Sequence, residues 1–196
     1  MRGYFEALLK TINDSIRSLD MNKFEELVSD ATSVLREGGK IIASGLGKNV
    51  PICEKFEGTM LSLGLNAKFL HTNTAVHGDL GAVHEGDLVI LLSKSGETTE
   101  SIYLLQQLKK RKGIRIWSIT FNEHSTLAEQ SDKALCISMD SEGDKWNIVP
   151  NNSTTLYLIV LQALAIEISN ELGLTLEDFR VNHPGGHIGV QLNGKQ

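Results

Sequence analysis

Residues 87–100, with the sequence DLVILLSKSGETTE, decide the fold. Their first half is a continuous apolar run after Asp87, which is typical of a short strand buried on both faces. A glycine and four hydroxyl side chains follow, and a helical pattern then extends to about residue 110. A buried strand that enters a helix through a tight polar turn is one unit of a parallel α/β sheet.

The same unit recurs along the chain. Short apolar runs predict four more strands, at residues 41–43, 67–70, 114–119 and 133–137. Further helices are predicted at about 50–63, 125–130 and 152–172. This alternation predicts a flavodoxin-like, doubly wound α-β-α sandwich of three layers with about five parallel strands. Because no linker or repeat interrupts the pattern, we expect a single domain over residues 1–196.

Two amphipathic helices precede the first strand. Their apolar faces run from Phe5 to Leu19 and from Phe24 to Leu35, and the second ends at a pair of glycines. We expect at least the first helix to pack outside the core, against another subunit. The sequence is therefore divided into a helical oligomerisation segment, residues 1–38, and a ligand-binding core, residues 39–196.

Composition excludes several classes of protein. The 196 residues are 41% hydrophobic and 22% charged, with a formal net charge of -5, which argues against a nucleic-acid-binding domain. Two isolated cysteines, Cys53 and Cys136, predict neither a disulfide framework nor a zinc site. The longest uncharged stretch, residues 147–166, contains Pro150 and three asparagines, so we expect its apolar part to be too short to span a membrane. These features predict a cytoplasmic protein.

Ligands of a doubly wound sheet bind beyond the carboxyl ends of its strands, which directs attention to the loops there. The loop at residues 93–100 places four hydroxyl side chains before a helix, and Gly96 allows a sharp turn and close approach to a ligand. Hydroxyls at a helix N-terminus predict a phosphate site. An ordinary N-cap with a capping-box carboxylate explains one hydroxyl and one glutamate equally well. The four hydroxyl residues are Ser93, Ser95, Thr98 and Thr99.

Two other loops carry polar side chains at the same predicted edge. SGLGKN, residues 44–49, matches neither a Walker nor a dinucleotide-binding motif, and its Lys48 either meets an anion or is solvated. In PNNSTT, residues 150–155, Asn152 and Ser153 either cap the next helix or hold ligand hydroxyls.

Five short motifs occur in order along the chain: GLGK, HGDLG, SxSGETxE, PxxSTT and HPGG. Together they resemble the SIS (sugar isomerase) domain over residues 24–196. Within that superfamily they are similar to the D-arabinose 5-phosphate isomerases. The resemblance implies active-site roles for Lys48, His77, Glu100, Glu142 and His183. It also implies phosphate binding by Ser93, Ser95 and Thr98, with Thr99 adding a further hydroxyl. Other expected substrate contacts are Ser44, Gly45, Asn152 and Ser153. Thr74 and Lys94 depart from the group, which commonly has glutamate and asparagine there.

The resemblance implies interconversion of an aldose and a ketose phosphate through an enediol, with D-arabinose 5-phosphate and D-ribulose 5-phosphate as the expected pair. Such a reaction needs a base of raised pKa, and a partly buried Glu100 or Glu142 meets that need. His77 and His183 are assigned to ring opening and oxygen protonation, and Lys48 to the enediolate. We expect no metal or organic cofactor.

The family also implies a homotetramer with shared active sites, in which His183 completes a neighbour's site. From the net charge and the short apolar stretch we expect no nucleic-acid or membrane partner. A second hypothesis is a non-catalytic sugar-phosphate-binding module with a regulatory role, because one fold can serve both functions. The titratable set favours the enzyme, since a binder needs only the phosphate loop.

Overall fold

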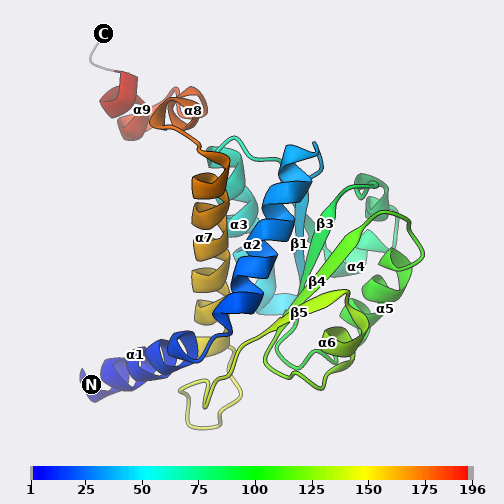
Figure 1. The fold of residues 1–196 in the computed structure, drawn as a ribbon. Helices are drawn as coiled ribbons and strands as arrows, with labels where there is room; N and C mark the ends of the chain where they lie inside the picture. The colour runs from blue at the N-terminus through cyan, green and yellow to red at the C-terminus, as the bar shows by residue number, and fades with distance from the viewer. Residues whose placement is uncertain (1, 194–196) are drawn as a thin grey trace.

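The computed structural model describes residues 2–193 and contains one sheet of five parallel strands in the order β2-β1-β3-β4-β5 (Figure 1). This order and the helices on both faces confirm the predicted doubly wound sandwich. The strands are β1 (Ile41–Gly45), β2 (Ala67–His71), β3 (Leu88–Leu92), β4 (Arg115–Thr120) and β5 (Lys133–Cys136).

Two helical layers enclose the sheet. One layer contains α2 (Met21–Arg36), α3 (Val50–Ser62) and α7 (Asn152–Leu172), and α1 (Arg2–Arg17) lies against α7. The opposite layer contains α4 (Thr72–Ala75), α5 (Thr99–Leu108) and α6 (Thr126–Gln130). Two 3-10 turns, η1 (Gly47–Asn49) and η2 (Asp79–Ala82), lie in loops, and α8 (Leu176–Val181) and α9 (Gly186–Asn193) follow α7.

The central strand β3 shows why the apolar runs of the sequence do not alternate. Leu88, Ile90 and Leu92 pack into the core under α2, α3 and α7. Val89 and Leu91 point to the other face and pack under α5 and α6. Since every side chain of β3 is buried on one face or the other, the strand needs apolar residues throughout.

The N-terminal helices have different roles in this chain. Ser15 is the only buried residue of α1, and Tyr4, Phe5 and Leu9 are exposed. Helix α2 instead contributes six buried residues, so the division at residue 38 does not coincide with a boundary of the folded core. The exposed N-terminal part of α1 lies outside the core, Ile12 and Ile16 pack against it, and the contact with another subunit stays a prediction, whereas α2 belongs to the sandwich.

Helix α7 corrects the expectation from the uncharged stretch. Its 21 residues are long and apolar enough to cross a membrane by length and composition, and it is the one such helix in residues 2–193. In the fold, however, α7 is the central helix of its layer, and Leu156, Tyr157 and Leu164 are fully buried against α2 and α3. This packing accounts for the apolar residues on its buried face.

Three short helices are not predicted by the sequence patterns. Helix α4 is a single turn directly after β2. Helix α8 begins with a capping box between Thr175 and Asp178, a T-x-x-D signal that the sequence displays and that could have located it. Helix α9 follows the HPGG motif, whose glycines obscure the helical pattern.

A buried carboxylate fixes the amino edge of the sheet. Asp87, just before β3, is 2% exposed and accepts hydrogen bonds from the backbone N–H groups of Lys40 and His84 at 3.0 and 2.8 Å. It also forms an ion pair of 2.6 Å with the Lys40 ammonium. This one side chain therefore ties the start of β1 to the start of β3.

We expect Asp87→Ala to lower the free energy of unfolding by about 3–5 kcal/mol, because it leaves a partly buried ammonium and two backbone donors without their acceptor. Urea denaturation followed by circular dichroism measures the change. Asp14→Ala, which breaks an exposed ion pair with Lys10, is the matched control and should remain close to wild type. Equal effects of the two variants would contradict the role assigned to Asp87.

Candidate active site at the carboxyl edge of the sheet

The strand order creates a switch point between β1 and β3. The chain leaves β1 toward α3 on one face and leaves β3 toward α5 on the other, so the two following loops diverge and leave a crevice. Helix α7 also begins at this edge (Figure 1). The three polar loops singled out from the sequence meet here, because the carboxyl ends of parallel strands lie together.

A cavity of about 260 Å³ lies in this crevice. Five of the predicted site residues line it: Lys48, Ser93, Ser95, Thr98 and Ser153. Its other lining side chains are those of Leu46, Asn49, Leu92, Lys94, Ser101 and Pro150. The loops after β1 and β3 thus form one wall, and residues 150–153 form the other.

The loop between β3 and α5 turns its hydroxyls toward each other. Ser93 Oγ lies 2.9 Å from Thr98 Oγ1 and accepts a hydrogen bond from the Gly96 N–H at 3.2 Å. Ser95 Oγ accepts the N–H of Glu97 at 3.1 Å. Thr98 is the N-cap of α5, but its side chain makes no capping hydrogen bond. The capping-box alternative is therefore wrong for this helix.

The first turn of α5 has free donors. Among residues 2–193, no acceptor contacts the backbone N–H groups of Thr99, Glu100 or Ser101, and Ile102 is the first to donate, to the Thr98 carbonyl. Unpaired N–H groups and the positive end of the helix dipole favour an anion at this position. The geometry is that of a phosphate cradle.

Gly96 makes the expected sharp turn and also packs closely against α6. Its φ of +68° is in the left-handed region that favours glycine. A Cβ here would lie 2.0 Å from the Oγ of Ser125, the N-cap of α6. Glycine is therefore required here for the close approach between the loop and α6. Glu97 adds to this contact by accepting hydrogen bonds from the N–H and hydroxyl of Thr126.

Glu142 is buried between the loop and α7, with 0% of its surface exposed. Its Oε1 lies 2.6 Å from Lys94 Nζ and accepts a hydrogen bond from Ser153 Oγ at 2.7 Å. Its Oε2 accepts the backbone N–H groups of Asn151 and Ser153 at 2.9 and 3.0 Å. A carboxylate offers about four acceptor positions, so these contacts occupy them all.

This environment overturns the expectation of a raised pKa. Burial pushes the pKa of Glu142 upward, but the Lys94 ammonium and the donors of Ser153 and Asn151 outweigh it, and the pKa lies below its ordinary value. Glu100 lies on the first turn of α5, is exposed, and has no side-chain hydrogen bond or ion pair to a described residue. It is therefore not the partly buried carboxylate that was expected.

The remaining predicted residues fall into two groups. The side chains of Lys48 and His77 are exposed in the loops after β1 and β2 and are free to meet a ligand. Three others are buried and committed within the chain. Ser44 Oγ lies 3.0 Å from Thr72 Oγ1, Asn152 Nδ2 donates to the Ser141 carbonyl, and Gly45 packs against Asn49.

His183 lies at the other end of the molecule. It follows α8, stacks on Phe179 with ring centroids 3.8 Å apart, and its Nδ1 is 2.9 Å from the Phe179 carbonyl. Helix α7 separates it from Ser153, and this helix of 21 residues is about 30 Å long at about 1.5 Å per residue. His183 of a chain therefore cannot reach the cavity of the same chain in this fold (Figure 1).

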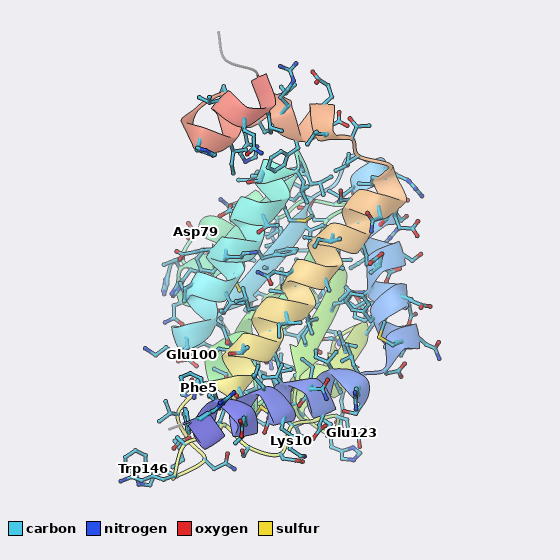
Figure 2. The ribbon with its side chains drawn as sticks, turned by 90° about the vertical axis from the view of Figure 1, so that its left-hand side faces the viewer. Phe5, Lys10, Asp79, Glu100, Glu123 and Trp146 are labelled. Carbon is cyan, nitrogen blue, oxygen red and sulfur yellow. The ribbon has the colours of Figure 1, made fainter. Side chains whose placement is uncertain are left out.

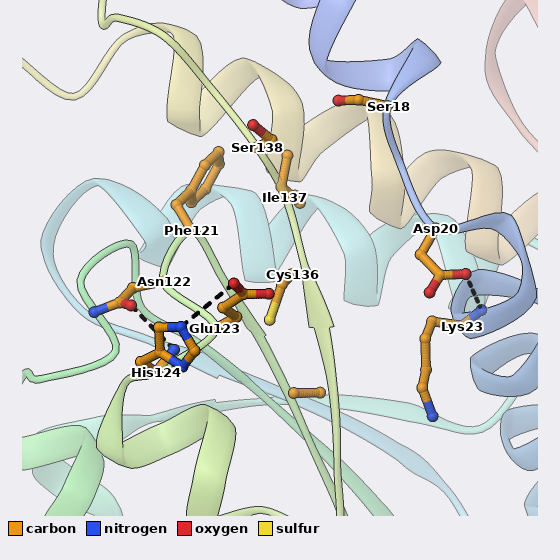
Figure 3. A pocket seen from close by; sticks show the side chains of 11 residues that line it. Ser18, Asp20, Lys23, Phe121, Asn122, Glu123, His124, Cys136, Ile137 and Ser138 are labelled. Atoms are coloured by element: carbon orange, nitrogen blue, oxygen red, sulfur yellow. Dashed lines mark hydrogen bonds and ion pairs between the residues drawn. The ribbon is translucent and has the colours of Figure 1, made fainter.

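A larger cavity lies elsewhere and contains none of the predicted residues. It has a volume of about 690 Å³, near the carboxyl ends of β4 and β5, and Figure 3 shows Asp20, Lys23, Glu123 and His124 around it. Its polar side chains have partners within the chain: Asp20 caps α2, Lys23 pairs with Glu26 at 2.7 Å, and Glu123 lies 3.5 Å from His124 Nε2. The smaller cavity, with its free helix N-terminus and Lys48, is the better candidate active site.

The sequence assigns no role to Lys94, the second cation that lines the smaller cavity besides Lys48. In the sequence it is only a departure from the family pattern, yet its ammonium joins the two walls through Glu142. A lysine inside a loop of small hydroxyl residues is the available signal, but its partner is 48 residues away in sequence and cannot be identified without the fold.

Comparison with known proteins agrees with the motifs. Residues 34–167 match the family model of the SIS domain. The arabinose 5-phosphate isomerase KdsD of Yersinia pestis is 34% identical over 187 residues, which are 95% of this chain and 57% of that protein. KdsD of Pseudomonas aeruginosa is 36% identical over 179 residues, covering 91% and 55%. The chain thus spans about half the length of these curated relatives.

A solved structure supports the same relationship. The Escherichia coli CFT073 protein c3406 in complex with arabinose 5-phosphate superposes with a TM-score of 0.86 at 36% identity, over 93% of this chain and 95% of that chain. The resemblance found from five short motifs is therefore confirmed. With a family model that matches most of its residues and a solved relative that it covers almost end to end, the chain belongs to the SIS domain family.

Proposed function

We propose that this chain is an isomerase that interconverts an aldose phosphate and a ketose phosphate, with D-arabinose 5-phosphate and D-ribulose 5-phosphate as the pair. The observation that carries the proposal is the cavity at the switch point, where hydroxyls and the uncapped N-terminus of α5 meet Lys48. The relatives named arabinose 5-phosphate isomerase and the solved neighbour that holds arabinose 5-phosphate support the choice of sugar.

The phosphate anchors the substrate in this scheme. Ser93, Ser95 and Thr98 donate hydroxyl hydrogen bonds, and Thr99 offers its N–H and its hydroxyl at the start of α5. Because the phosphate is fixed at one end, the reacting carbons have a defined distance and direction from it. The sugar then extends across the cavity toward Lys48 and toward the wall formed by residues 150–153.

The chemistry is a proton transfer between neighbouring carbons. A carboxylate removes the proton from C2 of the open-chain aldose, the electrons form the enediolate, and the same proton returns to C1. We assign the base to Glu100, because its carboxylate is free, whereas the acceptor positions of Glu142 are filled. The Lys48 ammonium stabilises the charge that develops on oxygen. His77 and His183 serve ring opening and oxygen protonation.

A complete site requires a second copy of the chain. His183 lies beyond the far end of α7, and the cavity is open on the side of Lys48. Apolar side chains are exposed near both ends of the molecule, which supports association into a homo-oligomer, proposed to be a tetramer. They are Tyr4, Phe5 and Leu9 on α1, and Leu176, Val181, Ile188 and Val190 on α8 and α9. No metal or organic cofactor takes part in the proposed steps, and a cytoplasmic location stays a prediction.

The first test is turnover itself. Wild-type protein in buffer with a chelator is screened against aldose and ketose pentose and hexose phosphates, and isomerisation is followed by proton NMR. We expect D-arabinose 5-phosphate and D-ribulose 5-phosphate to interconvert. Binding without turnover of any sugar phosphate would instead support the non-catalytic module.

The phosphate loop is tested by Ser93→Ala/Ser95→Ala. Each hydrogen bond to an ionised phosphate contributes about 1.5–3 kcal/mol, so the loss of two weakens binding of inorganic phosphate by about 100-fold or more. Isothermal titration calorimetry measures the affinity. Ser29→Ala, on the exposed face of α2, is the control. Unchanged affinity in the double variant would contradict the cradle.

The base is tested by Glu100→Gln. Loss of a general base lowers kcat by about 10²- to 10⁴-fold, and the thermal midpoint should stay near wild type because Glu100 is exposed. Glu129→Gln, on exposed α6, is the matched control for loss of a surface carboxylate. Turnover of Glu100→Gln close to that of wild type would return the role of base to Glu142.

The shared site is tested by mixing two inactive variants, Lys48→Met and His183→Gln. If His183 serves the cavity of a neighbour, a mixed oligomer contains sites with an intact Lys48 from one copy and an intact His183 from another, and activity returns on mixing. Light scattering gives the oligomeric state of the same samples. If both residues act within one chain, no site in the mixture is intact and activity stays absent.

A further inference from the structure

We propose that Lys94 is a positioning residue of the active site, which holds the phosphate loop against the amino end of α7 through its ion pair with buried Glu142. The proposal concerns the shape of the cavity, and only its expected effect on substrate kinetics rests on the proposed function. Lys94 has no role in the sequence-based assignment, where it is a departure from the family pattern.

The ion pair connects the two walls of the cavity. Lys94 lies in the loop between β3 and α5, and its carbonyl accepts hydrogen bonds from Phe121 N–H and Thr120 Oγ1, which fixes the backbone on the β4 side. Its ammonium reaches across to Glu142 Oε1 at 2.6 Å. Glu142 in turn holds the N–H groups of Asn151 and Ser153 at the start of α7. One chain of contacts therefore runs from the sheet, through Lys94 and Glu142, to α7.

Lys94 is the only cation that pairs with Glu142 in the described part of the chain. The other groups that face Glu142 are neutral. From α7 these are Ser153 and the Tyr157 hydroxyl, whose pKa is raised mainly by burial and in part by the charge on Glu142. From its own segment, Asn147 Oδ1 accepts the Glu142 N–H at 2.6 Å. From α1, the side chain of Leu8 packs beside Gly143.

This arrangement makes the state of Glu142 depend on one ammonium. A fully buried carboxylate without a counter-charge favours its protonated form, and a protonated Glu142 loses acceptor positions for Asn151 or Ser153. The wall at residues 150–153 would then lose part of its support. Lys94 prevents this while its side chain remains 42% exposed toward the cavity.

The direct test is a carboxyl ¹³C NMR titration of the full chain labelled at glutamate, with the Glu142 signal assigned from Glu142→Gln. We expect Lys94→Met to raise the titration midpoint of Glu142 by about 1–3 pH units, and Lys94→Arg to keep it near wild type. Lys48→Met is the matched control: it removes another cation that lines the cavity but does not pair with Glu142, so the midpoint should not move.

A double-mutant cycle separates positioning from direct phosphate binding. In calorimetry with inorganic phosphate, Lys94→Met should weaken binding strongly in the wild-type background and much less in the Glu142→Gln background, because the unpaired carboxylate is then gone. Equal losses in the two backgrounds, with an unchanged Glu142 titration, would overturn the proposal and make Lys94 a phosphate ligand.

Kinetics then connect the pair to catalysis. We expect Lys94→Met to raise KM more than it lowers kcat, with recovery of KM in Lys94→Arg, because a positioning residue shapes the cavity and does not touch the reacting carbons. A loss confined to kcat, with KM unchanged, would overturn the link to the site. The titration and the calorimetry need no turnover, so they decide the role of Lys94 even if the isomerase assignment fails.

Discussion

The buried carboxylate of Glu142 is the constraint on which the carboxyl edge of the structure depends. Four donors from two segments, the loop after β3 and the start of α7, converge on its two oxygens, and one of them is the ammonium of Lys94. Removing any single donor leaves part of the charge of a fully buried carboxylate without compensation. The loop after β3, the irregular segment before α7 and the first turn of α7 are therefore held in one arrangement, and the cavity takes its shape from it.

The sheet supplies the rest of the geometry. Its switch point sends the chain to opposite faces after β1 and β3, which leaves room for a ligand between the two loops. At that place α5 begins without a side-chain cap, and its first N–H groups have no acceptor among the described residues. Elsewhere in the chain comparable helix starts are capped, as at Asp20 for α2 and Ser125 for α6. Helices α3 and α7, which begin at the same edge of the sheet as α5, likewise lack a hydrogen bond to the side chain of the N-cap residue.

A single chain brings the hydroxyls of the proposed phosphate site and Lys48 to one cavity, but Glu100 and His77 do not line it, and His183 lies beyond the far end of α7. The length of α7 sets that separation, and α7 is rigid because its buried face packs on both α2 and α3. Figure 2 shows α1, which carries Phe5, crossing the lower end of the sandwich. Exposed apolar side chains at both ends are consistent with a site that another copy completes.

The sequence by itself determined the layers, the five strands and the loops that carry the candidate site. A strand buried on both faces gives a short apolar run, and a tight turn gives glycines, so both signals lie within a few residues of sequence. The helix at 152–172 and the loop at 93–100 are such cases. Only the tertiary structure decided which glutamate is free, what Gly96 contacts and where Lys94 points. Each of these depends on a partner distant in sequence, and the pKa of Glu142 in particular depends on the balance between burial and donors that folding brings together.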